Sequence, residues 1–262
     1  MQQITSLQNP LVKYLFTLTQ KSKQRKEQQQ FLIEGKREIS LALEAGYLIE
    51  QLFICPDILS EVEVEKLFSG YKCTAISTQV YEKLTYRSST EGILALAQCK
   101  NHALSGVEFQ KAHPLVLVAE APEKPGNIGA LLRTADAAGI DTVYIANPKT
   151  DLYNPNIIRS SVGTVFTVPI FMGSSEEIRS HLQQQGFAIY CAALTASQPY
   201  DKVSYKGRTA IVVGTEDTGL SPTWLKASTQ NIIIPMQGKI DSMNVSVSAA
   251  ILIFEAVRQR KG

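Results

Sequence analysis

Apolar residues along this chain fall into short runs, and their spacing switches repeatedly between a strand-like and a helix-like period. In the first hundred residues, continuous apolar runs typical of strands occur at 31–35, 48–54, 72–77 and 92–98. Amphipathic segments typical of helices lie between them, at 36–45, 58–68 and 78–84. This alternation predicts a small α/β domain over residues 1–100.

The alternation resumes with stronger signals after residues 101–112, which have neither period and are predicted to be a linker. Residues 114–121 form a near-continuous apolar run, as expected of a strand covered on both faces of a parallel sheet. Further strands are predicted at 141–146, 164–170, 187–194, 209–214 and 231–236, and helices at 128–138, 176–185 and 245–258. Residues 113–262 should therefore form a second α/β domain with its own core. The last helix is predicted to bury one apolar stripe, which consists of Val245, Ala249, Leu252, Ile253 and Ala256.

Composition narrows the class of protein. Of the 262 residues, 44% are hydrophobic and 19% are charged, which is typical of a packed globular protein and excludes collagen-like or largely disordered chains. No apolar run approaches the roughly 20 residues that span a bilayer, and the start lacks the features of a signal peptide, so a cytoplasmic protein is predicted. The cysteines and histidines are scattered, so neither a structural metal site nor disulfides are expected, and the cysteines are predicted to be buried small hydrophobes.

Charge is uneven along the chain although the net value is only +2. Between Lys13 and Arg37, seven basic residues occur with only two acidic ones. A stretch of this kind can bind the phosphates of a nucleic acid, and it is equally consistent with a solvated helix face.

Ligands of open α/β sheets bind beyond the carboxyl ends of the strands, so the loops after the predicted strands are the first places to look for function. The loop at 120–133 (EAPEKPGNIGALLR) contains neither the G-x-G-x-x-G of dinucleotide-binding folds nor the Gly-Lys-Ser/Thr of a P-loop. Asn127 is predicted to be the N-cap of the following helix, whose first N–H groups would favour an anion. Arg133 lies inside that helix beside small residues that would admit a ligand, and the alternative is an arginine on a solvated face.

Two further loops carry polar residues that a simple connection does not need. Residues 213–222 (VGTEDTGLSP) combine Gly214 and Gly219, which permit close backbone approach, with a Ser-Pro pair typical of a helix start. A turn into a helix explains everything in this segment except Glu216. Residues 234–247 (IPMQGKIDSMNVSV) form a polar excursion before the last helix, where each Ser or Asn taken singly is a candidate cap.

Together, three segments resemble the three motifs of the SpoU (TrmH) family of RNA 2′-O-ribose methyltransferases, in the SPOUT superfamily. They are NIGALLRTADAAG at 127–139, GTEDTGL at 214–220 and IPMQGKIDSMNVSV at 234–247, in family order and at family spacing. The segments ITSLQNPLVK and FLIEGKREI are similar to the substrate-binding domain that precedes the catalytic domain in many members. The resemblance implies a small α/β RNA-binding domain followed by a parallel-sheet SPOUT domain with a deep trefoil knot.

The resemblance also implies S-adenosylmethionine as the cofactor, bound in a bent form against the knot, with its adenine held largely by backbone groups. The expected cofactor-binding residues, by motif position, are Leu194, Thr195, Gly214, Gly219, Leu220, Ile234, Met236, Met243 and Val245. Met243 stands where leucine is more usual in the family, and a change from Leu to Met conserves volume. No metal is expected.

The catalytic residues that the resemblance implies are Arg133, Asn127, Glu216, Ser242 and Asn244. Arg133 matches the family's catalytic arginine, which is sometimes described as the base that takes the hydroxyl proton. A guanidinium normally stays protonated, so a bidentate phosphate clamp beside the developing alkoxide is the other role considered. Asn127 and Glu216 are expected to fix the helix start and orient Arg133, while Ser242 and Asn244 are expected to position the target ribose or its phosphate.

Four other residues are open to two interpretations. Arg159 either contacts RNA or has a structural surface role, and Tyr153, Phe166 and Tyr200 either stack on bases or belong to the core.

The function expected from the resemblance is methyl transfer from S-adenosylmethionine to a ribose 2′-hydroxyl in structured RNA. Ribosomal RNA is favoured over transfer RNA because of the N-terminal extension, which is an argument by analogy. A transfer RNA methylase and a non-catalytic RNA-binding or ribosome-assembly protein are the alternatives. The sequence does not identify the modified nucleotide, whether free RNA or an assembling particle is the substrate, or any role in antibiotic resistance. A homodimer through the C-terminal domain is expected from the family, with no membrane partner.

Overall fold

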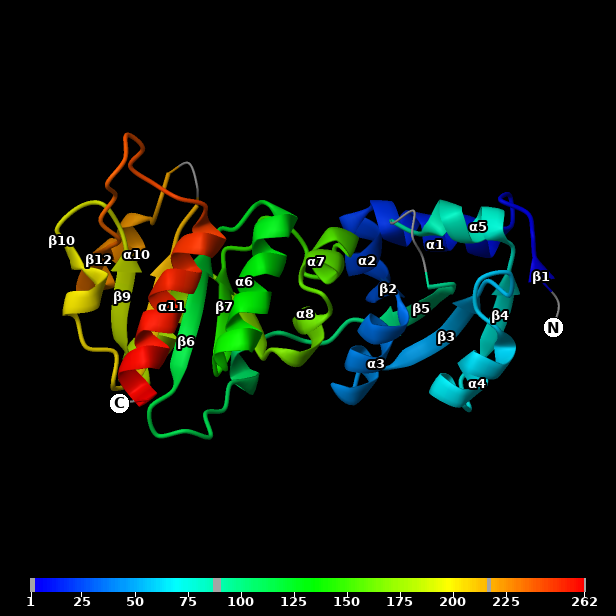
Figure 1. Ribbon diagram of the computed structural model, residues 1–262, viewed down its shortest axis with the longest axis horizontal. Helices are drawn as coiled ribbons and strands as arrows, with labels where there is room; N and C mark the ends of the chain where they lie inside the picture. Colours follow the sequence, from blue (N-terminus) through cyan, green and yellow to red (C-terminus); the bar gives the residue numbers. More distant parts are fainter. Residues whose placement is uncertain (1–2, 87–90, 216–217, 262) are drawn as a thin grey trace. The chain divides into compact units, whose positions relative to one another are not determined.

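The computed structural model describes residues 3–86, 91–215 and 218–261, and the chain divides into two units (Figure 1). The first unit contains Met1–Asn101 together with Asp151–Thr167, and the second contains His102–Thr150 together with Val168–Gly262. The sequence pattern assigns Asp151–Thr167 to the C-terminal domain, whereas in the structure this segment packs with the first unit. The functional domains at 1–100 and 113–262 remain predictions.

A mixed five-stranded sheet forms the centre of the first unit, in the order β1-β4-β3-β5-β2, and β5 runs antiparallel to both of its neighbours. Its strands are β1 (Gln3–Ile4), β2 (Gln30–Glu34), β3 (Ile49–Ile54), β4 (Cys73–Ile76) and β5 (Ile93–Gln98). Its helices are α1 (Pro10–Gln20), α2 (Ser22–Gln28), α3 (Lys36–Glu44), α4 (Glu61–Phe68), α5 (Thr78–Leu84), α7 (Pro155–Ser160) and α8 (Thr164–Thr167). The small N-terminal α/β fold predicted from the sequence is confirmed.

Residues 151–167 are held in this unit by a buried ion pair and an aromatic cluster. Arg25, only 3% exposed, donates from Nε and Nη2 to the Asp151 carboxylate at 3.0 and 2.6 Å. Phe31 stacks on Tyr153 and Phe166, with 4.1 and 6.0 Å between ring centroids. Tyr153 and Phe166 are both buried, so both are core residues.

Arg159 lies on α7, with its guanidinium carbon 5.1 Å from the centroid of the Tyr86 ring. In the second unit, Tyr200 is half-buried in a short 3₁₀ helix (Tyr200–Lys202), and its carbonyl accepts a hydrogen bond from the Tyr205 hydroxyl. Contact of Arg159 and Tyr200 with RNA remains a prediction.

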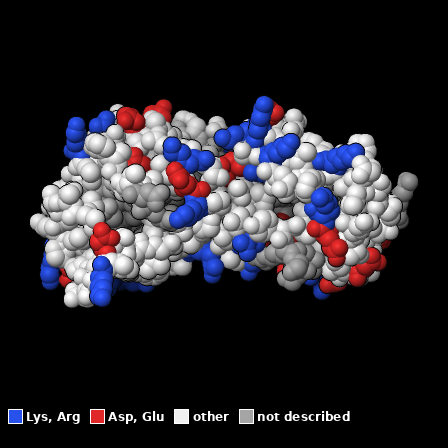
Figure 2. All heavy atoms as spheres, turned by 90° about the horizontal axis from the view of Figure 1, so that it is seen from above, with Lys and Arg blue, Asp and Glu red and all other residues white. Residues whose placement is uncertain are grey.

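The basic stretch seen in the sequence divides into one structural and several solvated residues. Arg25 is buried in its ion pair, whereas Lys13, Lys21, Lys23 and Lys26 are exposed on α1, on α2 and between them. Figure 2 shows basic side chains gathered on the face that carries α1 and α2. The four exposed lysines, and Arg37 beside its partner Glu38, are therefore available to a phosphate, whereas Arg25 is not.

The prediction of a strand at 164–170 is wrong except at its last residue. Residues 164–167 form α8, and the strand is β8 (Ile170–Gly173), which begins where the predicted strand ends. Gly163 has φ +86°, and the Thr164 hydroxyl donates to the Ser161 carbonyl, so a turn directs the chain into a helix. Burial of Val165 and Phe166 overrides the strand preference of their β-branched and aromatic side chains.

A seven-stranded sheet forms the centre of the second unit, in the order β10-β12-β9-β11-β6-β7-β8, and every described pairing in it is parallel. Its remaining strands are β6 (Leu115–Glu120), β7 (Thr142–Ala146), β9 (Ala188–Ala192), β10 (Ser197–Pro199), β11 (Thr209–Val213) and β12 (Gln230–Ile233). Its helices are α6 (Pro125–Ala138), α9 (Ser175–Gln184), α10 (Pro222–Ala227) and α11 (Val245–Lys261), with a 3₁₀ turn at Leu104–Gly106. The predicted parallel-sheet domain is confirmed, and the trefoil knot remains implied by the family.

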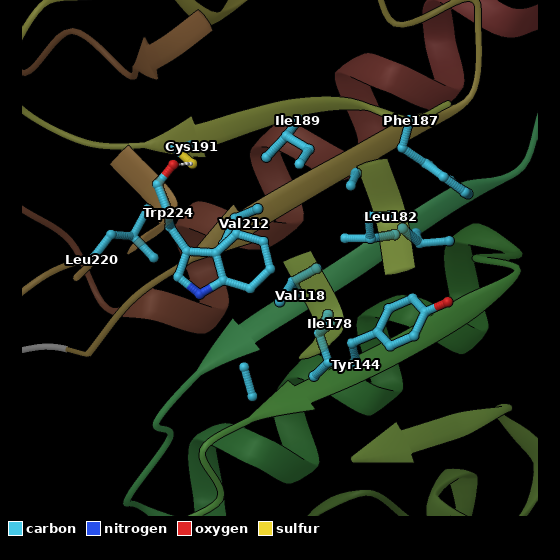
Figure 3. Close-up of a cluster of buried hydrophobic side chains, with 13 residues drawn as sticks. Val118, Tyr144, Ile178, Leu182, Phe187, Ile189, Cys191, Val212, Leu220 and Trp224 are labelled. Carbon is cyan, nitrogen blue, oxygen red and sulfur yellow. Dashed lines mark hydrogen bonds between the residues drawn. The ribbon is translucent and has the colours of Figure 1, made fainter. Parts of the chain in front are cut away.

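Trp224 of α10 lies at the centre of a core cluster between this sheet and its helices (Figure 3). Val212 and Ile189 approach it from the sheet, and Leu220 from the loop after β11. Cys191 is buried in the same cluster, where burial raises the pKa of its thiol to about 12, so the thiol is inert at neutral pH.

The predicted role of Asn127 as a helix N-cap is wrong. Helix α6 begins three residues earlier than predicted, at Pro125, with Lys124 as the N-cap, because proline suits the first helical position. The helix ends as predicted at Gly139, which has φ +66°. On α11, the predicted buried stripe is confirmed for Ala249, Leu252, Ile253 and Ala256, whereas Val245 is half-buried because it borders a pocket.

In the parts of the chain that the structure describes, no helix combines the length and apolar character needed to cross a bilayer.

Candidate functional site

Three loops meet at one end of the parallel sheet of the second unit. They follow β9, β11 and β12, which are neighbours in the sheet and all run in the same direction, so their carboxyl ends lie along one edge (Figure 1). A cleft of about 500 Å³ opens between these loops. Its size and position are those expected of a ligand site in an open α/β fold.

All nine residues predicted to bind the cofactor line this cleft. They are Leu194 and Thr195 after β9, Gly214, Gly219 and Leu220 after β11, and Ile234, Met236, Met243 and Val245 after β12. The structure thus brings together residues from three separated segments. Their contacts with a cofactor remain a proposal.

The glycines of the β11 loop are required by its geometry. Thr215 and Gly219 exchange two backbone hydrogen bonds of 3.2 Å, which folds the loop back on itself. A Cβ atom on Gly214 would lie 2.4 Å from the carbonyl carbon of Gly219, closer than any side chain permits. Gly214 therefore allows the close return of the loop, and the backbone faces the cleft without a side chain in between.

A second, smaller pocket of about 130 Å³ adjoins the cleft and shares part of its lining, including Gly214, Thr215 and Val245. Asn127 lines this pocket, and its side-chain oxygen accepts a hydrogen bond of 3.1 Å from the amide of Asn244. The Asn244 oxygen in turn accepts from the backbone and hydroxyl of Ser246 at 3.0 and 2.6 Å, as a helix cap does. Asn244 thereby joins the start of α11 to the start of α6.

The remaining predicted catalytic residues have different positions. Ser242 lines the cleft in the loop after β12. Arg133 is exposed on α6 and lines neither pocket. Glu216 lies outside the described residues.

Several residues that the sequence did not assign to the site also line the cleft. Thr215 and Thr218 belong to the same glycine loop, where the hydroxyl oxygens lie 2.8 Å apart, and the motif itself could have indicated them. Leu252 reaches the cleft from the second turn of α11, and its place in the apolar stripe of that helix gave no such signal.

The chemistry of the lining suits S-adenosylmethionine. Apolar side chains such as Leu220, Ile234 and Met243 can cover an adenine ring, while Asp241, Ser242 and the loop backbone offer polar partners. Within residues 3–86, 91–215 and 218–261, no group of three or more His, Cys, Asp and Glu side chains is arranged to hold a metal ion. Fold and cleft together define an α/β protein with a small-molecule site at the carboxyl edge of a parallel sheet.

Comparison with known proteins identifies the class. Residues 114–254 match the SpoU rRNA Methylase family, and residues 9–95 match the MRM3-like substrate binding domain. The 23S rRNA (guanosine(2553)-2′-O)-methyltransferase RlmP of Bacillus subtilis (strain 168) is 29% identical over 254 residues, which cover 97% of this chain and 98% of RlmP.

Solved structures agree with this match. An RNA 2′-O ribose methyltransferase is 39% identical, with 100% of both chains covered and a TM-score of 0.86. An AdoMet-bound rRNA methyltransferase from Sinorhizobium meliloti is 26% identical, with 98% of this chain and 97% of that chain covered and a TM-score of 0.89. The chain belongs to the SpoU rRNA methylase family, and it is an S-adenosylmethionine-dependent RNA (ribose-2′-O)-methyltransferase.

Proposed function

We propose that this chain methylates a ribose 2′-hydroxyl in 23S ribosomal RNA, with its N-terminal domain selecting the site. The observation that carries the proposal is that the cleft and the Asn127 pocket share lining residues, among them Gly214 and Val245, and that Asn244, the neighbour of Val245 in the chain, is bonded to Asn127. One pocket can hold a methyl donor while its neighbour admits the acceptor ribose. RlmP, which matches nearly the whole chain, acts on 23S rRNA according to its name, and this supports the same class of substrate here.

The nine cleft residues are proposed to hold S-adenosylmethionine. When bound, the cofactor supplies an electrophilic methyl group attached to sulfur. The chain itself supplies position, because an in-line approach of oxygen to that methyl gains most from fixed geometry. Gly214 and Val245 line both pockets, so they border the path between donor and acceptor.

Asn127, Asn244 and Ser242 are proposed to orient the acceptor. The two asparagines are already bonded to each other, so neither side chain is free to rotate independently. Ser242 adds a hydroxyl on the cleft side. Glu216, outside the described residues, is proposed from the motif alone to help orient the arginine.

Arg133 is proposed to clamp the phosphate of the target nucleotide beside the developing alkoxide. It lies six residues after Asn127, which corresponds to about 120° around the axis of α6 and about 9 Å along it. Since Arg133 is exposed on that side of α6, we propose that it reaches the target nucleotide bound by a second copy of the chain rather than by its own.

A homodimer through the C-terminal domain is proposed for this reason. Helix α11 packs against α6 and exposes Val247 and Phe254, each 48% exposed, with half-buried Ile251 between them on one face. Such an apolar face on a helix beside α6 suits an isologous contact. Mixing the inactive Arg133→Ala and Asn127→Ala variants tests the proposal. If Arg133 acts across the interface, each mixed dimer has one complete site of two, so the mixture should regain about a quarter of wild-type activity after random exchange, and about a half if all dimers are mixed. Monomers in sedimentation experiments would contradict it.

The exposed lysines of α1 and α2 are proposed to contact the RNA backbone. Replacing Lys13, Lys21, Lys23 and Lys26 with Gln should weaken RNA binding and lower the slope of log K against log salt by about three. Filter-binding at several salt concentrations measures this slope. An unchanged slope would leave these lysines as a solvated face.

Mapping 2′-O-methyl groups in RNA from cells with and without this protein tests the substrate. Loss of one mark in 23S rRNA is the expected result, and a mark lost only from transfer RNA would overturn the assignment. Ribosomal particles are the source of this substrate, so we propose that the protein acts in the cytoplasm.

A further inference from the structure

Glu120, at the carboxyl end of the central strand β6, is a buried carboxylate that none of the roles above uses. It is 4% exposed. Its Oε1 accepts hydrogen bonds from the hydroxyls of Ser175 and Ser221 at 2.7 and 2.6 Å, and its Oε2 accepts from the backbone N–H of Ser221 at 2.8 Å. A carboxylate is retained in the interior only when its oxygens are satisfied in this way.

Two of these three bonds come from Ser221, the residue that directly follows the cleft-lining part of the β11 loop. Ser221 is the N-cap residue of α10, and a serine in that position ordinarily accepts a bond from an N–H of the first helical turn. Here no such side-chain bond forms, and the hydroxyl donates to Glu120 instead. The serine therefore fastens the loop to β6 rather than capping its own helix.

In the described part of the β11 loop, Leu220 is buried in the core cluster, and the other residues have few connections to the sheet. Its described residues bond mainly to each other, through the Thr215–Gly219 backbone pair and the Thr215–Thr218 hydroxyl contact. Hydrogen bonds within a turn fix the shape of the turn, but they do not fix its position relative to the sheet. That position is set at the two ends, by Val213 in β11 at one end, and by Leu220 in the core cluster together with Ser221 on Glu120 at the other.

Glu120 also begins the loop that forms the other pocket. Ala121 follows it with φ +46°, an unusual conformation for a residue with a side chain, and donates from its N–H to the Ala146 carbonyl at 2.7 Å. The chain then turns into Pro122, Glu123 and Lys124, which line the Asn127 pocket. Glu120 thus belongs to the chain segment that forms one wall of the site, and it is hydrogen-bonded to the end of the β11 loop, which forms the other wall.

We infer that Glu120 is a positioning residue of the methyltransferase: through Ser221 it holds the glycine loop where the cleft accepts S-adenosylmethionine. The inference rests on the proposed cofactor site. Glu120 touches neither substrate nor cofactor, and its effect is transmitted by the loop. Loss of the carboxylate should weaken cofactor binding more than it lowers the maximal rate.

Two variants of the full-length protein test this role, with one control. Glu120→Gln removes the charge and replaces one of the two acceptor oxygens by an NH₂ group, so one of the two Ser221 donors loses its acceptor, and Ser221→Ala removes the hydroxyl bond alone. Thr209→Val is the control, because it removes a buried hydroxyl with two hydrogen bonds at the opposite end of β11. Calorimetric titration with S-adenosylmethionine and steady-state kinetics are run on all four proteins.

The expected result is a KM and Kd for S-adenosylmethionine raised by about tenfold or more in Glu120→Gln and by about threefold in Ser221→Ala. The KM for RNA and the kcat at saturating cofactor should stay within about threefold of wild type. Thr209→Val should lower the Tm with no change in either KM. A purely structural role would instead reduce the active fraction, which lowers the apparent kcat and leaves both KM values unchanged.

The outcomes separate the two claims. Wild-type protein that fails to bind millimolar S-adenosylmethionine would overturn the proposed cofactor site itself. Wild-type binding with an unaltered cofactor KM in Glu120→Gln would overturn the positioning role alone. If Glu120→Gln does not fold, Ser221→Ala decides, and a cofactor KM equal to that of Thr209→Val would reject the inference.

Discussion

Arg133 has an exposed side chain that borders neither pocket, and the prediction for it concerns the shape of its guanidinium. Arg133→Lys keeps the charge and loses the planar fork, so kcat should fall by about 10²-fold, while the Kd for S-adenosylmethionine stays within about twofold. Arg258→Lys, on an exposed turn of α11, is the matched control and should leave kcat unchanged. Steady-state kinetics with RNA measure both, and near-normal turnover of Arg133→Lys would count against the clamp.

His181 on α9 gives a pH-dependent prediction at the same scale. Burial lowers the pKa of this imidazole below its usual value of about 6.5, and its Nε2 is buried with no hydrogen-bond partner among the described residues. The unfolded chain therefore takes up the proton more readily, so this contribution to stability is present above about pH 6.5 and is lost as the pH falls below it. The Tm should drop between pH 8 and pH 5, and His181→Phe should make that drop smaller. An equal drop in both proteins would show that another group is responsible.

Among the elements, the last turn of α11 carries a prediction about stability. The Arg260 guanidinium donates to the carbonyls of His113, Tyr205 and Gly207, which lie where the chain enters β6 and β11. Arg260→Ala should lower the free energy of unfolding by about 2–3 kcal/mol, since three acceptors lose a charged donor. Arg258→Ala, which breaks a bidentate pair with Glu255 in which the arginine is 71% exposed, should cost about 1 kcal/mol or less. Urea denaturation of both variants measures the difference, and equal losses would contradict the assigned role.

Burial of the individual elements explains which strands and helices could be predicted from the sequence. Strands β6 and β11 are buried on both faces and therefore appear as continuous apolar runs, which is why both were predictable. Helix α8 has a strand-like sequence, and only its burial against the aromatic cluster makes it helical. Helix α2 and the short β10 have no clear period and were not predicted, and α1 was not predicted although Val12, Leu15 and Leu18 recur at a helical spacing.

The candidate site also has parts that could be predicted from the sequence and parts that could not. Its motifs identified the loops after β11 and β12, because glycine and polar residues there serve no packing purpose. The bond between Asn127 and Asn244 joins residues 117 positions apart, and no local pattern encodes such a contact. Glu120 was visible only as the last residue of an apolar run, and its partners emerge from the fold.

At the scale of the whole molecule, the chain leaves the second unit at Asp151 and returns to it at Val168. Asp151→Ala should lower the free energy of unfolding by about 3–5 kcal/mol, because it leaves the Arg25 charge buried without its partner. The double variant Arg25→Met/Asp151→Leu should recover most of this loss. Glu27→Ala, which breaks an exposed pair with Lys23, is the control and should have almost no effect. If Asp151→Ala is as mild as Glu27→Ala in chemical denaturation, the segment does not depend on this ion pair.

The central claim is that the cleft at the carboxyl edge of the parallel sheet transfers a methyl group to a ribose hydroxyl in ribosomal RNA. The most direct measurement is transfer of radioactive methyl from S-adenosylmethionine to purified 23S rRNA, followed by digestion to nucleosides. A single labelled 2′-O-methylnucleoside, absent with Asn127→Ala, is the predicted result. Label on a base, or no transfer by protein that binds S-adenosylmethionine, would contradict the claim.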